Sequence, residues 1–278
     1  MKIVRSILPL IAFTAVISPG VLTADNHQYR FFSAQYHYQY LWPHRKELKP
    51  LIQDAPESYE FKLGWKTSGT LSWHRTFNQP SYGIGYFYCD LGNPEELGEV
   101  RSGFIFMDFD LGRSETIRRS FSFSLGLSYF NRYYHPESNP ENRFIGAPWN
   151  VHFNINYSWL VPMFERIDLS PGVSFTHFSN GAYRKPNRGL NLFDVNLGLK
   201  YRIPGSGKGR LSVSEDDRIS TYLDQNLFVT YSLGFMQREI GDPTYRARTL
   251  TLNNTYRKRD WSGWGIGLDL FYDDHARE

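Results

Sequence analysis

Short segments in which apolar residues alternate with small or polar ones recur along most of the chain. The clearest lie at residues 121–129, 151–159, 173–179, 195–199, 227–235 and 264–270, with weaker ones at 31–40, 59–65, 82–88 and 105–111. A period of two places successive side chains on opposite faces of a β-strand. Turn-rich stretches separate the segments. The pattern predicts an all-β fold with about eleven candidate strands.

Two architectures give a strand one apolar and one polar face. A soluble sandwich or barrel turns the apolar face inward, whereas an outer-membrane barrel turns it toward lipid. Here the opposite face is rich in Gly, Ser and Asn, and aromatic residues gather near the strand ends. Both features are typical of transmembrane barrels, as a lumen lining and as interfacial girdles. We therefore predict an antiparallel transmembrane β-barrel of the outer-membrane type.

The strand count bears on how such a barrel closes. Bacterial barrels usually have an even number of strands, whereas about eleven candidates are present. The last apolar strand ends near Tyr272 and a polar segment, 273–278, follows it. Because barrels of this kind commonly end on an aromatic residue, the sequence raises the expectation that closing C-terminal strands are missing.

The N-terminal segment has the three parts of a secretory signal. Lys2 and Arg5 supply positive charge, an apolar run follows at 7–22, and Ala24 offers a small residue at the cleavage point. A membrane anchor is the alternative, but the apolar run is short and interrupted. We therefore expect residues 1–24 to be a signal peptide and residues 25–278 to form a single β-barrel domain in the bacterial outer membrane.

Composition and charge exclude several classes of protein. Aromatic residues make up 17% of the chain, so there is ample surface to bury and disorder is not expected. No later run of about 20 apolar residues would suit a polytopic helical membrane protein. The 31 basic and 28 acidic residues give a net charge of +3, without the basic patch of a nucleic-acid-binding protein. The single Cys89 excludes a disulfide framework and a cysteine-rich metal site.

Three polar residues share the apolar faces of two neighbouring predicted strands. His177 and Ser179 have the parity of Val173 and Phe175, and Asn191 has the parity of Phe193 on the next strand. The intervening segment is short enough to join antiparallel neighbours, which would set Asn191 opposite His177 and Ser179. All three side chains would then lie at the rim of the lipid-facing band.

Unpartnered polar groups are costly in such a position, about 2–7 kcal/mol each in an apolar medium. The cost falls if they bond to one another as a Ser–His–Asn set. His177 would take the proton from Ser179, and Asn191 would hold the imidazole tautomer through the other ring nitrogen. Chance is the alternative explanation, since His-x-Ser on a strand is a common tripeptide.

The segment His177-Phe178-Ser179-Asn180, followed by Pro186-Asn187-x-Gly189, resembles the signature of the PagL-type lipid A 3-O-deacylases. These are eight-stranded outer-membrane barrels whose His-x-Ser lies on the outer wall and whose triad a Glu completes. The matching position here is Asn191, which departs from that pattern.

With Asn rather than Glu at this third position, the chain is similar to outer-membrane phospholipase A, a twelve-stranded barrel with a Ser–His–Asn triad. That enzyme carries His-x-Ser-Asn-Gly, as residues 177–181 do, and its Asn also lies twelve residues after the Ser. Together with the stretch 142–150, the motif most resembles the acyloxyacyl hydrolase-like branch of the deacylase family in Bacteroidetes-type bacteria.

The resemblance implies a role for each matching residue. Ser179 would be the nucleophile, His177 the general base and acid, and Asn191 the orienting third member. Asn180, with the backbone N–H of Gly181 or Ala182, would form the oxyanion hole. The residues expected to shape the loop are Asn187 and Gly189, and those expected to contact lipid phosphate are Arg184, Lys185 and Arg188.

Other polar residues give weaker signals. The parity of His152 and Asp108 turns them toward the lumen. The remaining histidines considered as metal ligands lack acidic or cysteine partners at a suitable spacing; they are His37, His44, His74 and His135. We therefore predict no metal site and no cofactor.

Taken together, these features predict an outer-membrane serine ester hydrolase that removes an acyl chain from lipid A, with a membrane lipid as its partner and no nucleic acid. An outer-membrane phospholipase A is the alternative, and Ca²⁺ and a homodimer would then be expected as in that family. A passive pore or structural barrel is the non-enzymatic alternative.

Overall fold

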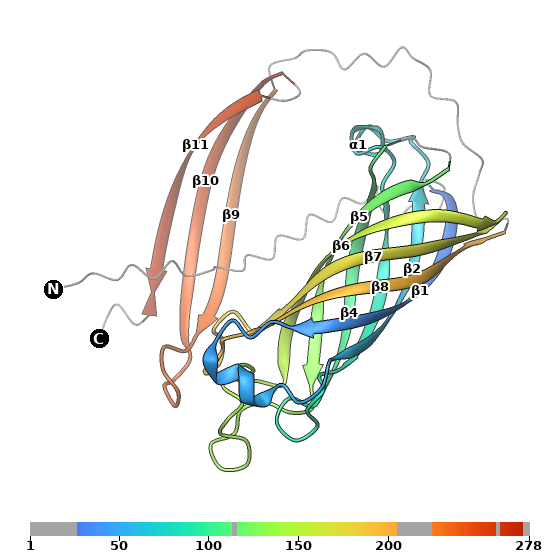
Figure 1. Cartoon of the computed structure of the whole chain (residues 1–278). Helices are drawn as coiled ribbons and strands as arrows, with labels where there is room; N and C mark the ends of the chain where they lie inside the picture. The colour runs from blue at the N-terminus through green and yellow to red at the C-terminus, as the bar shows by residue number, and fades with distance from the viewer. Residues whose placement is uncertain (1–26, 113–115, 205–223, 260–261, 275–278) are drawn as a thin grey trace. The chain divides into compact units, whose positions relative to one another are not determined.

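The computed structural model describes residues 27–112, 116–204, 224–259 and 262–274 (Figure 1). The predicted signal peptide, residues 1–24, lies outside the described residues. The strands are β1 (His27–Leu41), β2 (Glu57–Thr67), β3 (Ser81–Asp90), β4 (Glu99–Asp110), β5 (Arg118–Phe130), β6 (Trp149–Phe164), β7 (Ile167–Ser179), β8 (Leu190–Ile203), β9 (Asp224–Met236), β10 (Tyr245–Arg259) and β11 (Ser262–Asp273). Two short helices, η2 (Lys46–Leu51) and α1 (Ser72–Thr76), lie between strands. No helix among the described residues is long and apolar enough to cross a membrane.

Strands β1 to β8 form a closed antiparallel barrel in which each strand pairs with its neighbour in sequence. Closure comes from β1 and β8, which pair antiparallel from Arg30 opposite Ile203 to Leu41 opposite Leu192. The predicted outer-membrane barrel fold is therefore confirmed. Because β8 already satisfies the free edge of β1, this barrel needs no additional closing strand.

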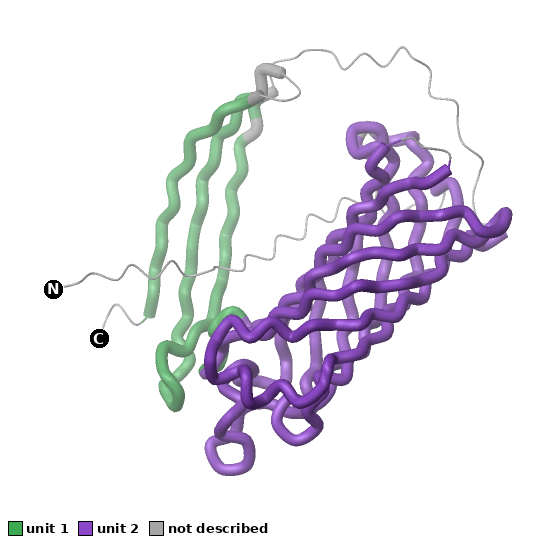
Figure 2. The backbone as a smooth tube through the Cα atoms, viewed as in Figure 1, with its two compact units in different colours: residues 1–18, 181–185, 213–278 green, residues 19–180, 186–212 purple. Residues whose placement is uncertain are grey.

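Strands β9 to β11 form a separate three-stranded sheet, and the chain divides into two compact units (Figure 2). Register places Leu233, Arg248 and Tyr272 side by side on one face of this sheet. That face is otherwise mostly apolar, so Arg248 weakens the alternation of β10, the one strand that the hydrophobic pattern did not locate. The expectation of a single domain over residues 25–278 stays a prediction.

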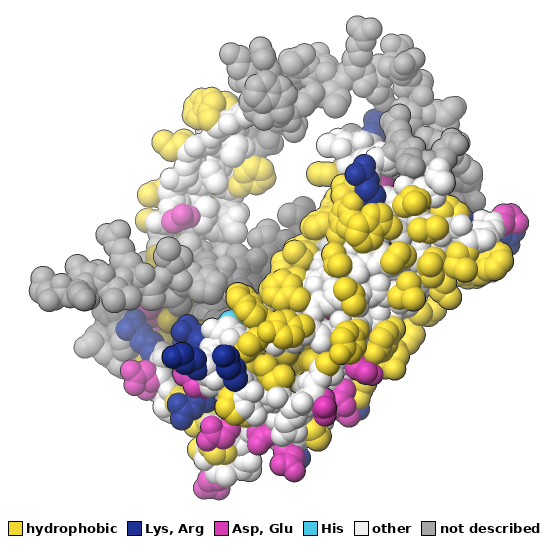
Figure 3. All heavy atoms as spheres, viewed as in Figure 1, with side chains coloured by type: hydrophobic (Ala, Val, Ile, Leu, Met, Phe, Trp, Pro, Cys, Tyr) yellow, Lys and Arg dark blue, Asp and Glu magenta, His cyan; other side chains and the backbone are white. Residues whose placement is uncertain are grey.

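The outer wall of the barrel is apolar. Figure 3 shows hydrophobic side chains forming a broad band over its visible face, with charged side chains gathered toward the ends. Exposed members of this surface include Ile84, Ile105, Leu127, Val195 and Leu197. Because every one of these lies at an outward position of its strand, the band continues around the wall, as lipid contact requires.

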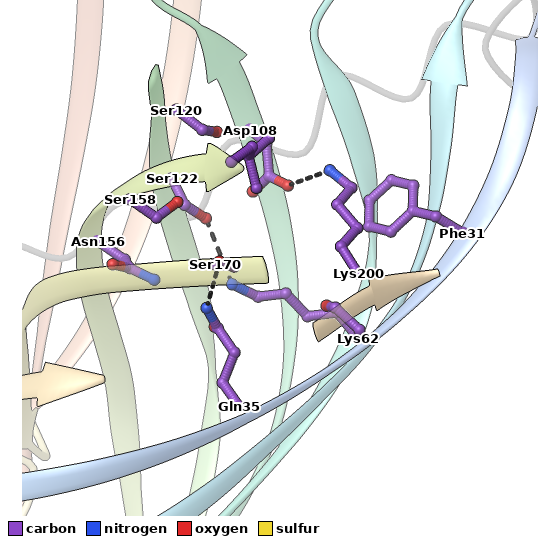
Figure 4. Close-up of a pocket in the computed structure, with 12 residues that line it drawn as sticks. Phe31, Gln35, Lys62, Asp108, Ser120, Ser122, Asn156, Ser158, Ser170 and Lys200 are labelled. Atoms are coloured by element: carbon purple, nitrogen blue, oxygen red, sulfur yellow. Dashed lines mark hydrogen bonds and ion pairs between the residues drawn. The ribbon is translucent and has the colours of Figure 1, made fainter. Parts of the chain in front are cut away.

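The lumen of the barrel is polar. A pocket inside it is lined by side chains from several strands, among them Lys62, Asp108 and Lys200 (Figure 4). Lys62 Nζ lies 2.8 Å from Glu60 Oε1, and Lys200 Nζ lies 3.7 Å from Asp108 Oδ2. His152 is fully buried, so the predicted lumenal positions of His152 and Asp108 are confirmed.

A buried apolar cluster closes one end of the barrel. It combines residues of the loops with residues at the strand ends, including Leu48 of η2, Leu97, Phe144, Phe178 and Leu190. Burial of such side chains stabilises the fold by about 1.5–3 kcal/mol each. The cluster therefore fixes the connections that follow β1, β5 and β7, and these connections surround the predicted site.

Candidate active site

The predicted site residues lie at the end of β7 and the start of β8. His177 is the register partner of Asn191, and Phe178 is that of Leu190. Phe178 and Leu190 are fully buried in the apolar cluster that closes this end of the barrel, whereas His177, Ser179 and Asn191 are half-buried. Because alternate side chains of a strand point to opposite faces, burial of Phe178 and Leu190 turns the three polar side chains to the outer wall.

The three polar side chains form one hydrogen-bonded set. His177 Nδ1 lies 2.6 Å from Asn191 Oδ1, and His177 Nε2 lies 3.0 Å from Ser179 Oγ. Since Asn191 Oδ1 only accepts hydrogen bonds, Nδ1 carries the ring proton and the lone pair of Nε2 faces the Ser179 hydroxyl. This geometry suits a histidine that takes a proton from a serine nucleophile.

The β7–β8 loop is held by backbone contacts close to the set. The N–H of Asn180 donates to Asn187 Oδ1 at 3.1 Å, and the N–H of Gly189 donates to the carbonyl of Phe144 at 3.0 Å. Gly181 and Ala182 both have positive φ, 63° and 67°. The side chain of Asn187 therefore shapes the turn that follows Ser179.

The predicted phosphate contacts differ in their surroundings. Arg188 Nη1 lies 2.9 Å from Glu47 Oε1 of η2. Hydrogen bonds from its own backbone amide and from the Arg188 guanidinium lower the pKa of the Glu47 carboxyl. Arg184 is exposed and Lys185 is half-buried. Arg188 therefore already has an anionic partner, which a lipid phosphate would have to replace.

His44 was considered in the sequence only as a metal ligand, and the structure places it beside Asn191. Its Nδ1 lies 3.4 Å from Asn191 Nδ2, and the two residues are 147 positions apart. The N–H of Trp42 also donates to the backbone carbonyl of Asn191 at 2.9 Å. No local motif links the segment after β1 to β8, so only the pairing of these strands reveals the contact.

A second group of Ser, His and acidic residues lies in the lumen, where His37 Nδ1 is 3.0 Å from Asp194 Oδ1 and Ser174 Oγ donates to Asp194 Oδ2. The carboxylate stands between the other two side chains, so His37 does not contact the Ser174 hydroxyl. This order of contacts does not activate a serine. In the described part of the chain, no group of three or more His, Cys, Asp or Glu side chains is placed to hold a metal ion.

Fold and site together define the class of protein: a transmembrane β-barrel with a Ser–His–Asn set on its outer wall. Residues 58–200 match the family model described as lipid A 3-O-deacylase (PagL), and the chain belongs to this family. The family and the barrel fold place the chain in the bacterial outer membrane. The resemblance drawn from the His-x-Ser motif is thereby confirmed at the level of the family.

Several solved structures resemble the barrel. The outer membrane enzyme PagL has 18% sequence identity and a TM-score of 0.40, over 62% of this chain and 99% of that one. Neisserial surface protein A (NspA) has 9% identity and a TM-score of 0.43, over 63% and 97%. The N-terminal β-barrel domain of Pseudomonas aeruginosa OprF has 9% identity and a TM-score of 0.37, over 64% and 99%. No curated protein matches the chain.

Proposed function

We propose that the chain is a serine esterase that removes an acyl chain from lipid A by a Ser179–His177–Asn191 triad. His177 Nε2 takes the proton of Ser179 as Oγ attacks the ester carbonyl carbon. The tetrahedral intermediate collapses, the alkoxide of the lipid leaves with the proton from His177, and the acyl group stays on Ser179. Water, activated by the same imidazole, then hydrolyses the acyl-enzyme and releases a fatty acid.

One observation carries this proposal: each ring nitrogen of His177 has the partner that the mechanism needs. Nδ1 lies 2.6 Å from the acceptor Asn191 Oδ1, and Nε2 lies 3.0 Å from the Ser179 hydroxyl. Membership of the lipid A deacylase family supports the same reaction class.

The position of the triad suits a substrate that stays in the membrane. Phe153 is the register partner of His177 on β6, and Phe193 lies two positions after Asn191 on the outer face of β8. Acyl chains would lie against these rings while the ester reaches Ser179. The triad lies at the end of the barrel where the connections follow β1, β3, β5 and β7. These connections are longer than most of those at the opposite end, which follow β2, β4 and β6, and longer connections are typical of the extracellular side. We therefore place the reaction in the outer leaflet.

Stabilisation of the oxyanion completes the mechanism. We assign it to Asn180 and to the backbone N–H groups of Gly181 and Ala182, which directly follow Ser179. Each donor of this kind typically contributes about 3 kcal/mol to the transition state. Arg184, Lys185 and Arg188 of the same loop would contact the phosphate groups of lipid A.

The direct test is incubation of purified protein with lipid A in detergent micelles, followed by mass spectrometry of the lipid. We expect loss of the mass of one acyl chain and release of a fatty acid. Ser179→Ala should abolish the reaction, whereas the matched control Ser174→Ala, which removes the lumenal serine, should retain it. Hydrolysis by Ser179→Ala would exclude the proposed nucleophile.

The same assay separates the alternatives. A phospholipase A would release fatty acid from glycerophospholipid vesicles and leave lipid A intact. Inhibition by EDTA together with a dimeric state would favour that enzyme, in which Ca²⁺ takes part. Ion conductance in planar bilayers without hydrolysis of either lipid would favour a passive pore.

A further inference from the structure

The orienting residue of the proposed triad is a carboxamide, and its two ends are not equivalent. Asn191 Oδ1 accepts hydrogen bonds, whereas Asn191 Nδ2 only donates them. If the amide turned by 180°, Nδ2 would face His177 Nδ1, and the ring proton would have to move to Nε2. Nε2 would then have no lone pair for the Ser179 proton. The orientation of the amide therefore decides whether His177 is a base.

His44 Nδ1 is the acceptor that faces the donor end of this amide, at 3.4 Å from Asn191 Nδ2. Nδ1 also lies 3.2 Å from the carbonyl oxygen of Trp42. That oxygen already accepts the backbone N–H of His44 at 2.8 Å. Because a carbonyl oxygen only accepts, the contact with Trp42 needs the ring proton on Nδ1, whereas the contact with Asn191 Nδ2 needs it on Nε2. The second tautomer, with a free lone pair on Nδ1, is the one that can hold the Asn191 amide.

The ring of His44 is held in place by its neighbours. It packs edge-on against Phe144 with centroids 6.0 Å apart, and it packs at a tilted angle against Trp42, also with centroids 6.0 Å apart. Phe144 is fully buried in the cluster that closes this end of the barrel. The backbone N–H of Trp42 donates to the Asn191 carbonyl at 2.9 Å, so β8 and the segment after β1 keep a fixed separation.

We propose that His44 is a positioning residue of this enzyme: it accepts a hydrogen bond from Asn191 Nδ2 and thereby keeps the ring proton of His177 on Nδ1. The inference rests on the proposed function. It follows from the amide at position 191, because the two oxygens of a carboxylate would be equivalent acceptors and would need no such partner.

Two substitutions of His44 in the full-length protein separate positioning from packing. His44→Phe keeps an aromatic ring against Phe144 but removes the acceptor, and His44→Gln supplies an acceptor without the ring. We expect His44→Phe to lower kcat for lipid A about tenfold, the effect of losing one hydrogen bond of typical strength, with little change in KM. His44→Gln should stay within about threefold of the wild-type kcat.

The Asn191→Asp variant tests whether His44 matters because the two ends of the Asn191 amide differ. Asn191→Asp has nearly the same shape and two equivalent acceptor oxygens, so His44→Phe should change kcat less than about twofold there. Unchanged kcat for His44→Phe in the wild-type background, or an equal loss for His44→Phe and His44→Gln, would overturn the proposal. An equal loss from His44→Phe in both backgrounds would assign His44 to packing. Activity in Ser179→Ala would instead contradict the triad itself.

Discussion

Gly189 lies directly against the imidazole of His177. A Cβ atom at Gly189 would stand 2.9 Å from His177 Cε1 and 2.9 Å from the carbonyl oxygen of Phe178. The backbone of Gly189 also has a φ of +71°, which L-residues with a side chain rarely adopt. Glycine at this position therefore allows the loop to pass close to the ring without displacing it.

Gly189→Ala should lower kcat by at least about tenfold, because the added methyl group displaces His177 and small misplacements of catalytic groups are costly. The strands should still pair, since the change lies in a loop. The measurement is kcat on lipid A micelles, with the heat-dependent gel shift of a folded barrel as the check on folding. Gly103→Ala is the control, because a Cβ at Gly103 meets no atom within 4 Å. Equal activity of the two variants would contradict the close contact.

Asn191→Ala should lower kcat about 10- to 100-fold. The variant loses the acceptor that keeps the His177 proton on Nδ1, while the nucleophile and the base remain. Initial rates of fatty acid release at saturating lipid measure the effect. Asn196→Ala is the matched control, because Asn196 lies on the lumenal face of the same strand and bonds to Asp194. A full rate in Asn191→Ala would show that the amide does not orient the imidazole.

Phe178→Ala should destabilise the barrel by about 3–5 kcal/mol, the usual cost of truncating a buried Phe. Its ring is fully buried and packs against Phe130 at 5.3 Å and His152 at 5.4 Å between centroids. Urea-induced unfolding in detergent or lipid gives the change in free energy. Phe164→Ala, at a site 65% exposed, should lower the free energy of unfolding less than Phe178→Ala does. A similar loss in both variants would argue against a stabilising role for the burial of Phe178.

Arg188→Gln and Glu47→Gln together separate phosphate binding from loop structure. If Arg188 contacts lipid phosphate, Arg188→Gln should raise KM for phosphorylated lipid A about three- to tenfold, and Glu47→Gln should leave KM unchanged or lower it. If the ion pair only holds the loop, the two variants should behave alike. Arg188→Gln should also raise the pKa of the Glu47 carboxyl toward its ordinary value, because it removes one of the hydrogen bonds that lower it.

Much of the barrel could be predicted from the sequence because the alternation of side chains is a local property of each strand. The parity of Phe175, His177 and Phe193 was enough to place the polar residues on the outer wall. The short loop between β7 and β8 was enough to predict that Asn191 faces His177. Antiparallel neighbours joined by a short connection leave few other pairings.

Other features depend on contacts between distant parts of the chain. Strands β9 and β11 have the same alternation as barrel strands, so the pattern could not tell that β1 pairs with β8 and that the barrel closes after eight strands. The same limit applies to His44, whose contact with Asn191 depends on the β1–β8 pairing, and to Glu47, whose pairing with Arg188 joins two loops.

The most direct measurement of the central claim is covalent labelling of the protein in micelles with a serine-reactive lipid phosphonate, followed by intact-mass and peptide mass spectrometry. The account predicts one adduct per chain, located on Ser179, with labelling much slower in His177→Ala and unchanged in Ser174→Ala. An adduct on another serine, or labelling of Ser179 at the same rate without His177, would contradict it.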